Sequence, residues 1–528
     1  MRLTVIVDED ARITRWQFEA LSMALTQGHS IEKVVRIENK GLTNHRSARN
    51  ALYYMLRVIN HVLLSSQKKI SIFELGLDDS DVVLIRSELV GNWEKIPENS
   101  YHLFKNSEVV IKFGMGLLRD PQDIPTKYGV LSYHHGNPDT YRGRPAGFWE
   151  IYSGDPVVGV IVQSISNKLD GGVIRARAFS RINPTSYGKT MEALYMAGIP
   201  LLNQALLSLE SNSHIESKSQ GTLYTLPKNL EVLRLLRKQL RCAVRRLWYG
   251  AFIEKKWKVS YFAQSEDWLD SRVLKSANLT ELPLTENSVF VADPCGSYLN
   301  GIYCEVLNEK SGKGEIVCWR YDKWEKLNLE QSNHFSYPQI IEDYERVFLF
   351  PEIASWASPK LFELSTDGLS CTGEFELQGL EETRLVDATL FKSEDTWFIF
   401  AGDPETSHQK LKLFHSNSLF GPYIEHTKSP IALDPRSSRM AGPIFVREGK
   451  IYRFAQNCSS SYGDGITVNR ILTLNKTDYQ ELLVNEISIA NQKGPHTLMI
   501  SDGKVWLDSY TEKFSLLAGW RRLKSKLL

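Results

Sequence analysis

The sequence has no excess of charge of either sign, since 63 basic residues balance 62 acidic residues to a net charge of +1. A nucleic-acid-binding protein usually carries a clearly basic domain, so this balance argues against a nucleic-acid partner. No apolar run approaches the roughly 20 residues that a membrane-spanning helix needs. The start, MRLTVIVDEDARI, lacks the basic and apolar regions of a signal peptide. Leu3 to Val7 are expected to form a buried strand instead.

Cysteine is scarce and scattered, with six residues at Cys242, Cys295, Cys304, Cys318, Cys371 and Cys458. No two of them form a CxxC pair, and none has a neighbouring histidine at the spacing of a metal site, so we expect no bound metal. Free, partly buried thiols are typical of a reducing compartment. The sequence therefore predicts a cytoplasmic protein.

Length and periodicity indicate several domains of different kinds. Hydrophobic residues make up 42% of the chain and charged residues 24%, which is ordinary for a globular protein, and the length predicts roughly two to four domains. Up to residue 212, short apolar runs such as LTVIV and DVVLI alternate with amphipathic stretches such as ITRWQFEALSMAL. This alternation is typical of an α/β domain with a mostly parallel sheet, which we place at residues 1–212.

Residues 213–250 are predicted to form a linker that contains a basic amphipathic helix. In KNLEVLRLLRKQLRCAVRRLW the leucines recur at helical spacing, with arginine or lysine between them. The C-terminal LLAGWRRLKSKLL is also basic and apolar. Each segment is either a helix packed against the rest of the chain or a helix that contacts an anionic membrane surface. The sequence leaves both interpretations open.

Residues 251–528 are rich in aromatic residues and turns, and they contain a repeat. Five segments, each a strand, a polar turn and a second strand, begin about fifty residues apart. Their starts lie near Ala292, Ser336, Val386, Ala441 and Gly494. Because a unit of this length holds four short strands, we predict an all-β, five-bladed propeller.

Two ionisable side chains follow predicted strands in the first domain. His134 ends a strand and precedes a turn that contains Asn137, and Asp170 follows a second strand and precedes two glycines. Ligands of open α/β sheets bind beyond the carboxyl ends of the strands, so we expect the two side chains to meet at one crevice. Imidazole suits proton transfer near neutral pH, and a neighbouring carboxylate fixes its tautomer.

The stretch GVLSYHHGNPDTYRGRPAGFWEIYSGD and the later LDGG resemble the signature of folate-dependent formyltransferases, in a divergent HHG type associated with amino-sugar modification. The resemblance covers about the first 210 residues. It implies a Rossmann-like α/β fold and an enzyme that transfers a formyl group from 10-formyltetrahydrofolate, its cosubstrate, to a primary amine. The matching positions are His134, Arg142, Gly143, Leu169, Asp170 and Gly172.

The resemblance also implies the roles of the catalytic residues. His134 would stabilise the oxyanion and move protons, and Asp170 would orient His134 and help to accept the amine proton. The asparagine of the family falls on Ser132, whose shorter hydroxyl offers one donor. A water on Ser132, or His135 or Asn137 from the following turn, would then replace it, or the chemistry is altered.

The same resemblance implies two binding sets. The folate pterin would lie against the glycine-containing loop of Phe113, Gly114, Met115, Gly116 and Leu117, where the glycines suit close approach to a flat ligand. The acceptor would contact His135, Asn137 and Arg142. Because basic residues cluster only in the segment 234–246, we disfavour transfer RNA as the acceptor. We expect an amino sugar, nucleotide-linked or within a glycan of polysaccharide biosynthesis.

The segments FPEIASWASPKLFEL and SSRMAGPIFVREGKIYRFAQNCSSSYGDGI resemble the propeller domain of plant glucosamine inositolphosphorylceramide transferases, which is similar to five-bladed glycoside-hydrolase propellers. The resemblance covers about Lys256 to Tyr510. It implies that Asp293, Asp387 and Arg439 line a central funnel. Tyr337 stands where such hydrolases often carry a further aspartate.

Three functional interpretations of the propeller stay open. Paired carboxylates can perform acid–base chemistry on a glycosidic bond, and Glu352 is a further candidate. We expect the propeller to bind a glycan or to have a structural role beside an active formyltransferase. Alternatively, the propeller is the enzyme, a glycosyltransferase or glycosidase, and the first domain is a regulatory sensor. In the third interpretation both domains form a binding scaffold.

Overall fold

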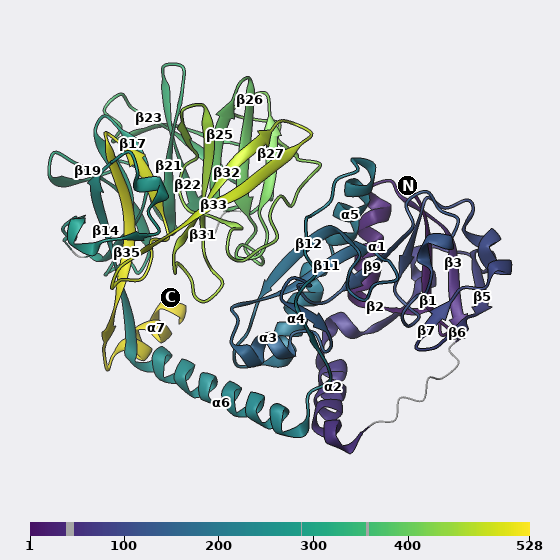
Figure 1. Cartoon of the computed structure of the whole chain (residues 1–528). Helices are drawn as coiled ribbons and strands as arrows, with labels where there is room; N and C mark the ends of the chain where they lie inside the picture. The colour runs from purple at the N-terminus through teal and green to yellow at the C-terminus, as the bar shows by residue number, and fades with distance from the viewer. Residues whose placement is uncertain (39–46, 287, 355–357, 528) are drawn as a thin grey trace. The chain divides into compact units, whose positions relative to one another are not determined.

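The computed structural model in Figure 1 describes residues 1–38, 47–286, 288–354 and 358–527. The chain forms two compact units, Met1–Val244 and Arg245–Leu528. The division falls inside helix α6 (Asn229–Phe252), within the segment predicted as a linker. The predicted fold class is confirmed, since the first unit is an α/β domain and the second contains five propeller sheets.

A seven-stranded sheet forms the core of the first unit, in the order β12-β11-β9-β8-β1-β3-β5. The five strands from β9 to β5 are parallel, and β11 and β12 add an antiparallel hairpin at one edge. Strand β1 is buried from Leu3 to Val7 because it lies between two other strands of the sheet, whereas the edge strand β12 alternates buried and half-buried residues. The strands are β1 (Arg2–Asp8), β3 (Ser30–Glu38), β5 (Val82–Arg86), β8 (Val109–Lys112), β9 (Val130–His134), β11 (Val157–Ser164) and β12 (Val173–Arg181).

Helices α1, α4 and α5 pack against one another, and α4 and α5 pack on the β11–β12 hairpin. Helix α1 begins with a capping box between Thr14 and Gln17, and the Ser186 hydroxyl caps α4. The helices of this unit before α6 are α1 (Arg15–Thr26), α2 (Ala51–Leu63), α3 (Phe148–Ser153), α4 (Tyr187–Gly198) and α5 (Leu201–Glu210). Three short strand pairs complete the unit: β2 (Arg12–Thr14) with β4 (Lys69–Ser71), β6 (Glu88–Val90) with β7 (Trp93–Lys95), and β10 (Tyr141–Gly143) with β13 (Thr222–Tyr224).

The second unit contains the five blades that the repeat predicts. Three blades have four strands in chain order. They are β17 (Ser288–Tyr298), β18 (Gly301–Asn308), β19 (Gly314–Arg320) and β20 (Lys323–Lys326); β21 (Phe335–Asp343), β22 (Arg346–Ile353), β23 (Lys360–Leu364) and β24 (Cys371–Glu376); and β25 (Val386–Ser393), β26 (Thr396–Gly402), β27 (Lys412–Ser416) and β28 (Ile424–Glu425). The fourth consists of β29 (Arg439–Met440), β30 (Phe445–Arg447), β31 (Lys450–Gln456), β32 (Ile466–Leu474) and β33 (Tyr479–Ile489), with β15 (Val273–Leu274) at its edge.

The last blade is built from both ends of the propeller sequence. Strand β14 (Ile253–Ala263) pairs along its whole length with β35 (Lys504–Phe514), and β16 (Thr280–Glu281) and β34 (Leu498–Ser501) flank this pair. Eleven residue pairs join β14 to β35. This pairing joins the two ends of the propeller sequence within one blade and so closes the ring of blades.

Each of the first three blades carries a bulge at the same point of its first strand. Asp293, Tyr337 and Asp387 all take a positive φ, of 51°, 48° and 48°, and the strand register shifts beside each of them. Such backbone is uncommon outside glycine and re-aims a side chain. The sequence repeat thus corresponds to a repeated strained backbone position that carries a buried side chain in each of these three blades.

Helix α7 (Ala518–Leu527) follows β35 and contacts the end of α6. Among the described residues, no helix combines the length and the apolar character that crossing a membrane would require.

Candidate functional site

The imidazole of His134 and the carboxylate of Asp170 meet in the first unit, as the sequence predicts. Their closest atoms, Nδ1 and Oδ1, are 3.1 Å apart, and about a tenth of each side chain is exposed. The route by which they meet differs from the expectation. Strand β11 runs antiparallel to β9, with Ile161 opposite His134 and Ser164 opposite Leu131. The carboxyl ends of the two strands therefore lie at opposite edges, and the loop after β11 folds back to bring Asp170 to His134.

Backbone and side-chain contacts hold this loop in place. The second oxygen of Asp170 accepts a hydrogen bond from the Gly143 N–H at 2.9 Å, and Arg142 donates to the Leu169 carbonyl at 2.9 Å. Gly143 has a φ of +84°, and a Cβ there would overlap the carbonyl oxygen of Tyr224. Asp170 itself has a φ of 52°, and non-glycine residues in this region are typical of strained functional sites. Arg142 is thus a positioning residue for the loop.

The electrostatics favour a charged Asp170. Burial raises the pKa of Asp170, but the hydrogen bond and charge of His134 and the Gly143 N–H outweigh it, so the pKa is lowered. Nδ1 of His134 therefore carries a proton and donates to Asp170. Nε2 of His134 is buried and has no hydrogen-bond partner among the described residues. A Cβ on Gly136 would lie 2.9 Å from Nε2, so the missing side chain leaves space beside it.

Ser132 lies on the same face of β9 as His134, two residues earlier. Its hydroxyl has only long contacts, at 3.5 Å, with the carbonyls of Lys112 and Tyr133. Gln163 lies directly opposite Ser132 on β11 and is buried. The Gln163 oxygen accepts from the Gly172 N–H at 3.2 Å, which leaves its amide nitrogen as a donor. Sequence analysis did not identify Gln163, because only the antiparallel pairing places it beside Ser132.

The loop predicted to hold the pterin is fixed by a buried polar cluster. The N–H groups of Met115 and Gly116 donate to Asp8 at 3.2 Å and to Glu94 at 2.9 Å. Lys112 donates to the Met115 carbonyl, and burial, opposed by Glu94 and Asp8, lowers the pKa of Lys112 to about 8.

Each glycine of this loop makes room for a group of the protein itself. A Cβ on Gly114 would overlap the backbone of Val7 and Asp8, and a Cβ on Gly116 would lie 2.6 Å from a Glu94 oxygen. Close packing of the chain therefore requires these glycines, and the expectation that they also allow a flat ligand to approach the loop stays a prediction. Leu117 is 42% exposed and available to a ligand, whereas Phe113 packs against Trp16 and Tyr133.

The surroundings of His135 and Asn137 differ from those of His134. The His135 ring lies in a cluster with Trp16, Tyr133 and Tyr195, at centroid distances of 5.3, 6.3 and 4.9 Å. Burial lowers the pKa of His135 to about 3, so this ring is neutral. The Asn137 oxygen accepts from the Asp139 N–H at 3.3 Å and stabilises its own turn. These positions fit packing and turn formation better than the predicted contacts with an acceptor.

Glu150 of helix α3 is a candidate that the sequence did not single out. It is 3% exposed, and burial, reinforced by Asp155, raises its pKa to about 7. Its side chain borders a gap of about 10 Å³ that Gly136 and Gly143 also line. This gap is about the size of one water molecule, and Gly136, which lines it, lies next to Nε2 of His134. Only three-dimensional packing identifies this carboxyl group.

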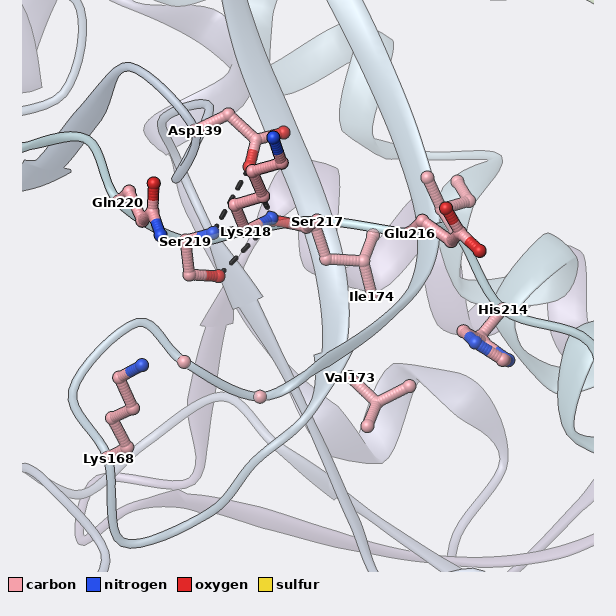
Figure 2. Close-up of a pocket in the computed structure, with 13 residues that line it drawn as sticks. Asp139, Lys168, Val173, Ile174, His214, Glu216, Ser217, Lys218, Ser219 and Gln220 are labelled. Carbon is pink, nitrogen blue, oxygen red and sulfur yellow. Dashed lines mark hydrogen bonds between the residues drawn. The ribbon is translucent and has the colours of Figure 1, made fainter.

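A cavity of about 750 Å³ adjoins the loop that carries Asp170. Figure 2 shows Lys168 and the loop on one side and the 214–220 segment on the other, with Asp139 accepting hydrogen bonds from Ser217, Lys218 and Ser219. His134 and Asp170 do not themselves line the cavity, but Lys168, Gly171 and Gly172 do. The cavity therefore offers room for a substrate next to the pair.

A second polar cluster lies at the centre of the propeller. Nδ1 of His496 contacts Asp508, and Nε2 lies 3.2 Å from Asp293. All three side chains are buried, and their ligand-type atoms lie within 4.8 Å of one another, close enough for a metal ion. Burial and the charges of Glu305, Asp508 and Asp387 raise the pKa of Asp293, whereas His496 and neighbouring N–H groups lower that of Asp508 against its burial. The expectation that the protein binds no metal stays a prediction.

The other predicted funnel residues form one network. Arg439 pairs with Asp387, Nη2 to Oδ1 at 3.2 Å, and Gln456 donates to the second Asp387 oxygen at 3.1 Å. A Glu352 oxygen accepts from the Asp387 N–H at 2.8 Å, and burial together with the Asp387 charge raises the pKa of Glu352 to about 7. The Tyr337 hydroxyl bonds the Thr389 hydroxyl and accepts from the Gly442 N–H, and thus links the second blade to the third and the fourth.

Fold and sites thus define a two-unit protein, an α/β domain with a His–Asp pair joined to a five-bladed propeller with a carboxylate-rich centre. Residues 263–500 match the family model for the N-terminal region of glucosamine inositolphosphorylceramide transferase 1. The rice protein of that name (Oryza sativa subsp. japonica) is 31% identical over 230 residues, 40% of this chain and 30% of the rice protein. The Arabidopsis thaliana protein is 27% identical over 241 residues, 43% and 31% of the two chains. The chain thus spans about 30% of the length of these relatives, and the predicted resemblance of the propeller is confirmed.

Solved structures are similar to parts of the chain at low sequence identity. An N-formyltransferase from Helicobacter canadensis in complex with folinic acid and dTDP-3-aminofucose has 13% identity and a TM-score of 0.30, over 60% of this chain and 98% of that one. An α-L-arabinanase from Cellvibrio cellulosa has 14% identity and a TM-score of 0.28, over 37% and 79%.

Proposed function

We propose that the first unit transfers a formyl group from 10-formyltetrahydrofolate to the primary amine of an amino sugar. One observation carries this proposal: the buried Nε2 of His134 has no partner, while Nδ1 is held by a charged Asp170. The space beside Gly136 and the exposed Leu117 fit a ligand approaching from the folate loop. Met115 and Leu117 would contact the pterin.

The residues have distinct roles in this chemistry. 10-Formyltetrahydrofolate supplies the formyl carbon, and its N10 leaves with a proton as the amine nitrogen bonds to that carbon. Nε2 of His134 accepts the proton that the amine loses and then donates it. Asp170 stabilises the imidazolium. The Gln163 amide and the Ser132 hydroxyl donate to the formyl oxygen, where negative charge develops.

The experiment is direct. The protein is incubated with 10-formyltetrahydrofolate and a panel of amino-sugar nucleotides and amino-sugar glycans, and products are weighed by mass spectrometry. We expect an acceptor that is heavier by one formyl group. If no amino sugar in the panel is formylated, and no amino acid either, the proposed activity is wrong.

The propeller supports a second candidate, glycan processing or glycosyl transfer in the second unit. The match to the glucosamine inositolphosphorylceramide transferases falls on this unit alone. The buried Asp293 and Asp387 and the half-buried Glu352 provide carboxyl groups, and burial raises the pKa of Asp293 and of Glu352. Asp293→Asn distinguishes the two candidates. It should abolish a propeller activity on glycans and leave formyl transfer intact, whereas His134→Ala should do the reverse.

A further inference from the structure

Helix α6 presents an apolar row to solvent on the first unit. Leu230, Leu233, Leu236, Leu240 and Val244 recur at helical spacing, and between 41% and 66% of each residue is exposed. Monomeric soluble proteins rarely expose contiguous apolar surface of this kind, so the row marks an interaction surface. The amphipathic character that the sequence predicts is thus present, but the row of leucines is directed outward.

The inner face of the helix is anchored, which prevents the row from turning inward. Val232 and Leu235 are fully buried. Lys238 donates to the carbonyls of Ile151 and Tyr152, each at 3.0 Å, at the end of α3. The Asn229 oxygen accepts from the Leu52 N–H at the start of α2. Because these contacts fix the rotation of α6, its leucine row stays exposed.

One flank of the row is basic. Arg234, Arg237 and Arg241 follow it at helical spacing, are exposed, and have no hydrogen bond or ion pair with any residue that the structure describes. The single acidic residue of the helix is Glu231. The whole chain carries a net charge of only +1, so this concentration of positive charge is local.

Helix α2 repeats the pattern nearby. Its outer face exposes Met55, Val58, Ile59, Val62 and Leu63, by 47% to 73%. The starts of α2 and α6 touch through Asn50 and Asn229, so both apolar faces begin at one corner of the first unit. In the second unit, helix α7 also exposes a tryptophan, Trp520, beside Arg521.

We propose that the α6 surface binds an anionic lipid bilayer, with the leucine row among the acyl chains and the arginines at the headgroups. A peripheral helix of this type combines an apolar face with a basic flank, and each basic residue adds attraction to anionic lipid. Self-association through the same row is disfavoured by charge. Two copies would bring arginine rows together without acidic partners, whereas paired helices usually oppose unlike charges at these positions.

Cosedimentation with unilamellar vesicles tests the proposal. We expect the full chain to bind vesicles that contain phosphatidylserine at least about tenfold more tightly than pure phosphatidylcholine vesicles, with loss of binding at high salt. The variant Arg234→Gln/Arg237→Gln/Arg241→Gln should bind anionic vesicles about 100-fold more weakly. Leu233→Asn/Leu236→Asn/Leu240→Asn should lose binding and keep its melting temperature.

A matched control is Leu482→Asn/Leu483→Asn, which alters two equally exposed leucines on β33 and should bind vesicles like the parent. Formyl transfer to a soluble acceptor should be unchanged in the α6 variants, which separates this proposal from the function of the site. The proposal is overturned if the parent binds no vesicles or binds both kinds equally. A dimer that the leucine variant dissociates, without vesicle binding, would assign the surface to a second copy instead.

Discussion

At the scale of single residues, His134 and Asp170 act as a unit, because one imidazole nitrogen is bonded to Asp170 and the other is buried without a hydrogen-bond partner among the described residues. His134→Ala and Asp170→Asn should each lower the rate of formyl transfer by about 10²–10⁴-fold with little change in stability. Steady-state assays with mass-spectrometric detection measure this. His135→Phe is the control, since its ring packs among aromatics and should be replaceable. An equal loss in His135→Phe would contradict the assignment.

Ser132 and Gln163 are the two candidates for the hydrogen-bond donor to the formyl oxygen, the role of the asparagine in the formyltransferase signature. The carboxamide of Gln163 is longer and already oriented by the Gly172 N–H, so it should be the principal donor. Gln163→Leu is expected to lower kcat about 10²–10³-fold, and Ser132→Ala much less. Measuring kcat and KM for both variants tests this assignment. A larger loss of kcat in Ser132→Ala than in Gln163→Leu would assign the role to Ser132.

The raised pKa of Glu150 predicts that the stability of the folded protein depends on pH. Its folded-state pKa of about 7 lies above its ordinary value of 4.5. Below pH 4.5 the carboxyl is protonated in both states, and as the pH rises towards 7 the unfolded state ionises first, so the folded state loses stability. Glu150→Gln removes this cost and should raise the free energy of unfolding by about 3 kcal/mol at pH 8 and by less than about 1 kcal/mol at pH 5. Denaturant unfolding of the first unit at both pH values tests this, and an equal gain at both would contradict it.

At the scale of elements, the turn after β10 depends on one glycine. Gly143→Ala should cost about 1–2 kcal/mol for its positive φ and about 1–3 kcal/mol more for overlap with Tyr224. It should also displace the N–H that holds Asp170 and so reduce formyl transfer. Gly129→Ala is the matched control, because Gly129 has a φ of +73° but open space around it. Similar losses in both variants would show that the contact with Tyr224 is unimportant.

Elements that depend on local periodicity were predictable from the sequence. The strand ending at His134, the basic helix and the five repeats are all present, since alternation and helical spacing are properties of neighbouring residues. The antiparallel direction of β11 was not predictable, because an apolar strand of this kind carries no signal of its direction. Gln163 and Glu150 were not identified from the sequence, because the residues that surround them in the fold are distant in the chain.

At the scale of the whole molecule, the propeller depends on a clasp between its two ends. Removing residues 504–528 deletes β35, the partner of β14 along eleven residue pairs. We expect this truncation to abolish cooperative unfolding of the second unit and to expose hydrophobic surface to dye binding, while the first unit keeps its own transition. A chain shortened only after residue 515 keeps the clasp and serves as the control. Cooperative unfolding of the longer deletion would show that four blades suffice.

That clasp also governs how the propeller can be combined with other domains. Because the entry strand β14 and the exit strand β35 are neighbours in a single blade, the chain enters and leaves the ring at the same blade. A ring fastened in this way can be transplanted between unrelated polypeptides. The plant proteins share residues of this ring and, over most of their length, nothing that aligns with this chain.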